Sequence, residues 1–188
     1  MRSALIGSFV VAAAFGNASG PTADFTDIGG ILAPQPGNKA CYARAYDKAH
    51  LRAHPHQRIA AMKFLLAVEA YPEPSKKERP EDLYYYTFAM QVARRGDKRP
   101  LHTAGDCTAY GGIRCVVDCD GGAVTLDAMP PAGSLIVRIA EEGIRMFHDC
   151  DEEEGILIMP GQDDKVFRLE KTSIEACRTL EPKEDDGK

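Results

Sequence analysis

Alternating apolar residues in the middle of the chain restrict it to a β fold. Residues 58–71 and 84–95 both place apolar side chains at every second position. Successive side chains of a strand point to opposite faces, whereas a helix repeats about every 3.6 residues, so the pattern predicts two strands with one buried face each. The alternating residues are Met62, Phe64, Leu66 and Val68 in the first segment and Tyr84, Tyr86, Phe88, Met90 and Val92 in the second.

Shorter segments of the same kind follow, separated by turn-forming pairs such as Gly111-Gly112 and Pro130-Pro131. They predict strands at about 101–107, 113–119, 123–129, 134–140, 144–150, 155–159 and 165–170. A parallel sheet would need helical crossovers, and these connections are too short for them. The predicted fold class is therefore all-β: an antiparallel barrel or sandwich of about eight to nine short strands, with an irregular N-terminal arm and one short helix.

The two ends of the chain differ in composition from this β domain, which is predicted over 58–180. Residues 1–18 combine a basic start, an apolar run and small residues, which is typical of a secretory signal peptide cut after Ala18 or as late as Ala23. Residues 24–57 are the predicted arm, whose helix over 48–54 is capped by Asp47 and ended by Pro55. Residues 181–188 are predicted to be a disordered acidic tail.

The chain contains six cysteines, all beyond the predicted signal peptide. An even number in an exported chain indicates disulfides, and no Cys-x-x-Cys pair typical of metal sites is present. The sequence alone does not fix the connectivity. We favour Cys41–Cys177, which joins the arm to the C-terminal segment, and Cys107–Cys115, which joins the strands around Gly111-Gly112. Cys119–Cys150 follows by elimination.

The tripeptide Asp-Cys-Asp occurs twice, around Cys119 and around Cys150. A two-residue turn at Gly121-Gly122 would pair Cys119 with Val124 in a hairpin. In this register the cysteine faces the core and the flanking aspartates face solvent.

A second, weaker turn signal is Glu142-Gly143. A hairpin centred there would pair Leu135 with Cys150 and Val137 with His148. Again the cysteine would face the core, with Asp149 and Asp151 outside, and His148 would lie on the core face.

Two sets of side chains are candidate metal ligands, and no other cofactor is predicted. His50, His54 and His56 suit zinc or copper, because two histidines one helical turn apart share a face, although no fourth ligand is near and a solvated turn is the simpler interpretation. A Cys119–Cys150 disulfide would gather four carboxylates that could hold calcium, although separation of the carboxylates into solvent is the simpler interpretation. These carboxylates belong to Asp118, Asp120, Asp149 and Asp151.

The functional prediction is a non-enzymatic binding or envelope-associated protein, periplasmic or secreted. A rigid scaffold with acidic loops suits a basic protein or peptide as partner, and the formal net charge of −5 argues against nucleic acid. No segment beyond the signal peptide has the length of a membrane span. The alternative is a periplasmic hydrolase that uses His148 and nearby carboxylates as acid and base, without a recognisable nucleophile motif.

Three stretches carry a resemblance to known proteins: CYARAYDKAHLRAHPHQ (41–57), RCVVDCDGG (114–122) and DDKVFRLEK (163–171). With them the chain resembles a group of small exported proteobacterial proteins of unknown function. The resemblance extends over most of the mature chain. It implies export and no particular activity.

Overall fold

The computed structural model describes residues 28–72, 84–109, 111–118, 120–129, 133–149, 152 and 154–181. The predicted signal peptide, residues 182–188 of the predicted tail, and Cys119, Cys150 and Asp151 lie outside the described residues. The helices among the described residues have at most seven residues, and none of them could span a bilayer.

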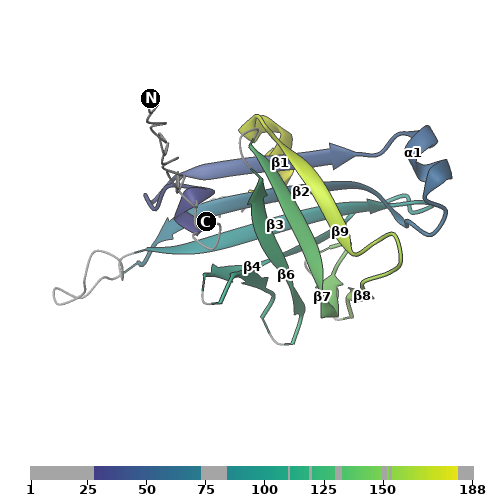
Figure 1. Ribbon diagram of the computed structural model, residues 1–188. Coiled ribbons are helices and arrows are strands. Elements are labelled where there is room, and N and C mark those ends of the chain that lie inside the picture. The colour runs from purple at the N-terminus through teal and green to yellow at the C-terminus, as the bar shows by residue number, and fades with distance from the viewer. Residues whose placement is uncertain are drawn as a thin grey trace, which may run out of the picture.

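The described chain forms nine strands, one short α-helix and two 3-10 helices (Figure 1). All strand pairs are antiparallel. In chain order the elements are η1 (Ile28–Gly30), β1 (Lys39–Ala45), α1 (Lys48–Ala53), β2 (Ile59–Ala70), β3 (Tyr84–Arg94), β4 (Leu101–Thr108), β5 (Ile113–Val116), β6 (Gly122–Met129), β7 (Ser134–Met146), β8 (Ile156–Ile158), β9 (Val166–Thr172) and η3 (Ile174–Leu180).

Eight of these strands close into a barrel, which confirms the all-β prediction and decides between barrel and sandwich. The order along the sheet is β6-β5-β4-β3-β2-β1-β9-β7-β8, and β6 also pairs with β7. That last pairing closes the ring and leaves β8 as an additional strand on β7. Figure 1 shows β6, β7 and β9 crossing in front of the long strands β1, β2 and β3.

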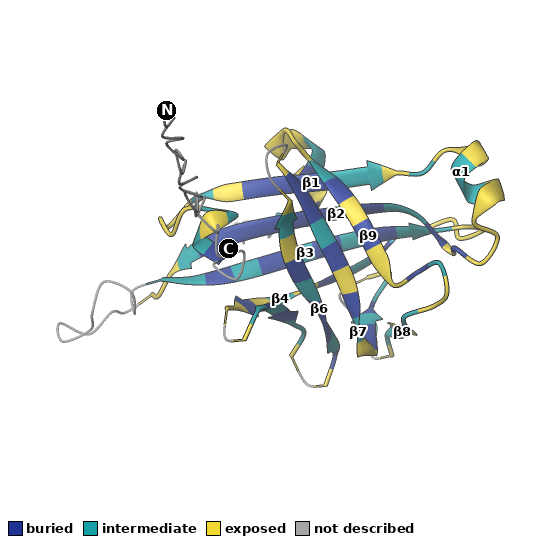
Figure 2. Ribbon diagram, in the orientation of Figure 1, coloured by how far each residue is buried: buried dark blue, intermediate teal, exposed yellow. Residues whose placement is uncertain are grey.

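Side chains of the alternating positions fill the inside of the barrel. Met62, Phe64 and Leu66 on β2 meet Phe88 and Met90 on β3, and all five are buried. The rings of Phe64 and Phe88 stack with their centroids 5.5 Å apart. Buried and more exposed positions alternate along the strands in Figure 2. Each fully buried side chain of this size contributes about 1.5–3 kcal/mol, so this interior is the main source of stability.

Two disulfides are present in the described part of the chain. Cys41 on β1 is bonded to Cys177 in η3, and Cys107 on β4 to Cys115 on β5. Two of the three favoured pairs are therefore present in the described part. The helix η3 lies on the outside of the barrel, where Cys41, Leu65, Cys177 and Leu180 form a small buried cluster separate from the main core.

The barrel begins earlier than predicted, because part of the predicted arm is strand β1. Residues 39–45 pair with β2 on one side and with β9 on the other. Neighbouring residues Ala40, Cys41 and Tyr42 are all buried, since Tyr42 faces the barrel core while Cys41 lies beneath η3. Burial on both faces removes the alternation by which a strand is recognised. The short helix, by contrast, lies at Lys48–Ala53 with its predicted cap: the Asp47 carboxylate accepts the His50 N–H at 2.7 Å.

The hairpin of β5 and β6 has a different register from the predicted one. Val124 pairs with Cys115 and not with Cys119. The turn is centred before Gly121: the Gly121 N–H donates to the Asp118 carbonyl (3.3 Å), and Asp120 has a φ of 59°. The shift is by an even number of residues, so Cys115 and Val124 still face the core, as predicted for this face.

The predicted turn at Glu142-Gly143 is wrong, because β7 runs through it without reversing. The strand pairs with β9 near its start, with β8 near its end and with β6 along its other edge. Val137 pairs with Leu126 and Phe167, so the predicted pairing of Val137 with His148 is wrong as well. Leu135 pairs with Ala128 and Leu169 instead of Cys150. Gly143 has a φ of 80°, but it lies at an irregularity in the pairing of β6 with β7 and not in a turn.

Candidate functional site

His148, the catalytic candidate, lies just beyond β7 and not on the core face. It is half-buried, its Nδ1 is 3.1 Å from the Pro100 carbonyl oxygen, and its backbone N–H donates to Glu152 at 3.0 Å. A carbonyl only accepts, so Nδ1 carries the proton and Nε2 remains as the basic atom. Asp149 and Glu152 both contact Arg99, which neutralises the nearest carboxylates. These contacts among the described residues hold the loop in place.

His102 lies beside His148 and is not predicted from the sequence as a site residue. Its backbone forms the bridge between β4 and the residue after β7: the His102 N–H donates to Phe147 (2.6 Å) and the Phe147 N–H donates back (2.8 Å). Burial lowers the pKa of His102, the charge of Asp149 opposes this, and His148 and Lys63 add to the lowering. No local motif distinguishes His102, because its environment is created by a strand over 40 residues away in the sequence.

The three histidines near α1 do not converge on one point. The rings of His50 and His54 stack with centroids 4.4 Å apart, and Tyr46 stacks on His50 at 4.6 Å. Ring nitrogens bind metals in the plane of the ring, so parallel rings direct their lone pairs side by side. His50 Nε2 also lies 3.0 Å from Gln57 Oε1. The zinc or copper site stays a prediction, and binding would require the stack to open.

Of the four aspartates considered for calcium, the structure describes Asp118, Asp120 and Asp149. Asp149 contacts Arg99, while Asp118 lies near Asp106. Burial raises the pKa of the Asp106 carboxyl, and the charge of Asp118 raises it further. No group of three His, Cys, Asp or Glu side chains among the described residues is placed to hold a metal ion. The calcium site likewise stays a prediction.

Exposed apolar side chains lie close to these carboxylates, across the end of β7. The Arg145 N–H on β7 donates to the Gly121 carbonyl at 2.7 Å, and Arg145 pairs with Leu157 on the other side. The loop that carries Asp118 and Asp120 is thus two strand spacings, about 10 Å, from Leu157. Leu157 is 42% exposed and Met159 is 51% exposed. We call Asp106, Asp118, Asp120, Leu157 and Met159 the acidic-apolar face.

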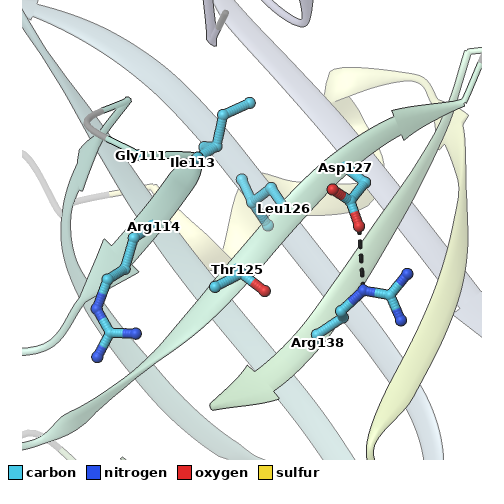
Figure 3. Close-up of a pocket in the computed structure, with 8 residues that line it drawn as sticks. Gly111, Ile113, Arg114, Thr125, Leu126, Asp127 and Arg138 are labelled. Carbon is cyan, nitrogen blue, oxygen red and sulfur yellow. Dashed lines mark hydrogen bonds and ion pairs between the residues drawn. The ribbon is translucent and has the colours of Figure 1, made fainter. Parts of the chain in front are cut away.

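A surface hollow of about 340 Å³ lies on the outer side of β5, β6 and β7 (Figure 3). Thr125 lies between Arg114 and Arg138 in the cross-strand register. Arg138 pairs with Asp127 at 3.0 Å, and Arg114 contacts Glu142. Both arginines are therefore neutralised by carboxylates of the same face, as in an ordinary solvated sheet surface.

Comparisons with known proteins add no family to this description. A scan against protein-family models and searches of the curated proteins and of the solved structures found no match.

Proposed function

We propose that this chain is an exported, non-enzymatic binding protein that engages a basic protein or peptide through the acidic-apolar face. The observation that carries the proposal is the exposure of Leu157 and Met159 close to carboxylates that form no ion pair with a described cation. Methionine and other apolar anchors within a charged rim are typical of protein-binding surfaces. A cationic peptide with an apolar side fits both features.

Support for a binding role also comes from the barrel itself. Its interior is packed with side chains, so a partner would act on the outside. Disulfides hold the described scaffold, and a rigid surface loses little entropy on binding. A periplasmic or secreted location follows from the predicted signal peptide and from the disulfides, which persist in oxidising compartments. Membership of the group of small exported proteobacterial proteins is proposed on the same basis.

The experiment is calorimetric titration with a synthetic amphipathic peptide of lysine and leucine. We expect the double variant Leu157→Ser/Met159→Ser to bind about tenfold more weakly, because two partly exposed apolar side chains lose their burial in the complex. Asp118→Asn/Asp120→Asn should also weaken binding and reduce its dependence on salt. Asparagine tolerates the positive φ of Asp120, so this variant should preserve the turn.

Matched controls distinguish binding at this face from non-specific binding. Tyr71→Ser/Ile174→Ser removes two similarly exposed apolar side chains elsewhere on the barrel and should leave binding unchanged. A peptide with glutamate in place of lysine should not bind. Failure of the lysine-leucine peptide to bind, or equal losses in both apolar double variants, would rule the proposal out.

A further inference from the structure

A second hollow, beside α1, is lined by three cationic side chains. Lys48, Leu51 and Arg52 come from α1, and Arg95 directly follows β3. Lys48 and Arg52 are one helical turn apart, so their side chains share a face of the helix. The hollow has a volume of about 310 Å³ and shares no residue with the acidic-apolar face.

Backbone contacts hold Arg95 in this position. Its Nη1 donates to the carbonyls of Leu51 (3.3 Å) and Gln57 (3.2 Å), and its backbone N–H donates to Arg58 (2.7 Å). Gln57 is itself buried, and its Nε2 donates to the Ile59 carbonyl at 2.7 Å. The guanidinium is therefore fixed before any ligand arrives, which reduces the entropy lost on binding.

The cations of this hollow lack the carboxylate partners that Arg114 and Arg138 have. Within the described part, Lys48, Arg52 and Arg95 take part in no ion pair closer than the usual limit of about 4 Å. The carboxylate of Asp47 is engaged as the helix cap, and the hydrogen bond from the His50 N–H is the main cause of its lowered pKa. The helix start is thus already capped and takes no part in the site.

The segments around the hollow carry a local charge opposite to that of the chain. Residues 46–58 and 94–99 contain seven basic residues, Lys48, Arg52, Arg58, Arg94, Arg95, Lys98 and Arg99, against Asp47 and Asp97, which gives +5 in a chain of −5. Asp163 and Asp164, which bond to the backbone of residues 56–59, and Asp149 and Glu152, which pair with Arg99, reduce this to +1. An anion therefore meets a positive local field in spite of the acidic composition.

We propose that the α1 hollow binds a phosphate group. Three cations around one concavity suit a compact, doubly charged oxyanion better than a single carboxylate, because phosphate offers more acceptor oxygens and more charge. Arg95 presents a fixed planar donor group, while Lys48 and Arg52 adjust from the helix. The phosphate can belong to a soluble monoester or to a lipid headgroup, and the test distinguishes these sources.

The test compares inorganic phosphate and glycerol phosphate with chloride at equal ionic strength, at about pH 8 where free histidines are neutral. We expect both phosphates to raise the thermal unfolding midpoint of the wild-type protein above its value in chloride. In calorimetric titration, Lys48→Gln/Arg52→Gln should bind about tenfold more weakly, since two of three cations are lost. The thermal unfolding midpoint of this double variant in chloride shows whether its fold is intact.

The matched control is Arg114→Gln/Arg138→Gln, which changes the net charge by the same amount at the neutralised hollow. It should bind phosphate like the wild type. Sedimentation with phosphatidylcholine vesicles, with and without phosphatidic acid, then identifies the source: binding that needs both phosphatidic acid and Lys48/Arg52 assigns the site to lipid headgroups. Binding of soluble phosphates without vesicle binding assigns it to soluble ligands. Equal weakening in both double variants, or no phosphate effect with any probe, would overturn the proposal.

Discussion

At the scale of single residues, two glycines allow β6 and β7 to approach each other closely. Gly122 has a φ of 77°, and a Cβ atom on it would lie 2.1 Å from the carbonyl oxygen of Gly143. That oxygen belongs to the backbone and cannot move aside as a flexible side chain can. Gly111 has a similar φ of 70°, but a Cβ there would meet nothing within 4 Å.

Alanine substitutions at Gly111 and Gly122 allow the steric cost of an added methyl group to be measured separately from the cost of a positive φ. Gly111→Ala should lose about 1 kcal/mol of unfolding free energy through backbone conformation alone. Gly122→Ala should lose about 2–4 kcal/mol, because the strands must also separate to admit the methyl group. Urea denaturation of both variants gives the comparison. Similar losses at the two positions would show that the close approach of β6 to β7 is absent in solution.

At the scale of elements, strands could be predicted from the sequence and their turns only in part. Alternation identified β2 and β3 because each has one buried face, whereas β1, buried on both sides near Cys41, had no such signal. A glycine at position 143 predicts a turn, although positive φ is common to turns and to irregularities inside strands. Its true role depends on β6 and β8 on either side, which no local window contains. For the same reason, the predicted position of His148 on the core face is wrong.

In the candidate sites, too, features formed by neighbouring residues could be predicted from the sequence, whereas features formed by residues distant in the sequence could not. The helix with Asp47 as its cap and His50 and His54 on one face could be predicted from neighbouring residues. The α1 hollow could not be predicted from the sequence, because Arg95 reaches it from the end of β3. The acidic loops were recognised, but the contacts of Asp149 and Glu152 with Arg99 were not. Cys119–Cys150 stays a prediction, and a peptide map of the oxidised protein can test it.

The two described disulfides should contribute unequally to stability. The chain-entropy argument gives about 5 kcal/mol for a bond across the 136-residue separation of Cys41 and Cys177. It gives about 2.5 kcal/mol for the short loop between Cys107 and Cys115, whose separation is 8. Cys41→Ala/Cys177→Ala should therefore lower the urea midpoint more than Cys107→Ala/Cys115→Ala. The opposite order would mean that η3 stays attached by its apolar contacts without the bond.

At the scale of the whole molecule, the barrel wall between β4 and the end of β7 is held by the bridge of His102 and Phe147. Because burial lowers the pKa of His102 in the folded state, the unfolded chain binds this proton more readily. The contribution of His102 is therefore complete above about pH 6.5, the unfolded value, and is lost as the pH falls through the lower folded value. Acidification should weaken the fold at this closure.

We expect the urea midpoint to fall between about pH 7.5 and pH 5, and to fall less in His102→Gln. Asp47, Glu142 and Glu170 have lowered pKa values, so their contributions are lost only below about pH 4.5, outside this window. Asp106, whose pKa is raised, acts in the opposite direction and does so equally in both proteins. His56→Gln, at an exposed histidine, is the control. Identical pH profiles for the wild type and His102→Gln would contradict the prediction.

The position of β1 between β2 and β9 has a consequence for the order in which the chain is made. β2 follows β1 after a short helix, but β9 contains residues 166–172, close to the C-terminus. One edge of β1 therefore stays without its partner until residues 166–172 have been synthesised. Cys41 emerges long before Cys177, and Cys107 comes between them. An oxidase that joined cysteines in order of appearance would pair Cys41 wrongly, and the native bond would then require later thiol–disulfide exchange.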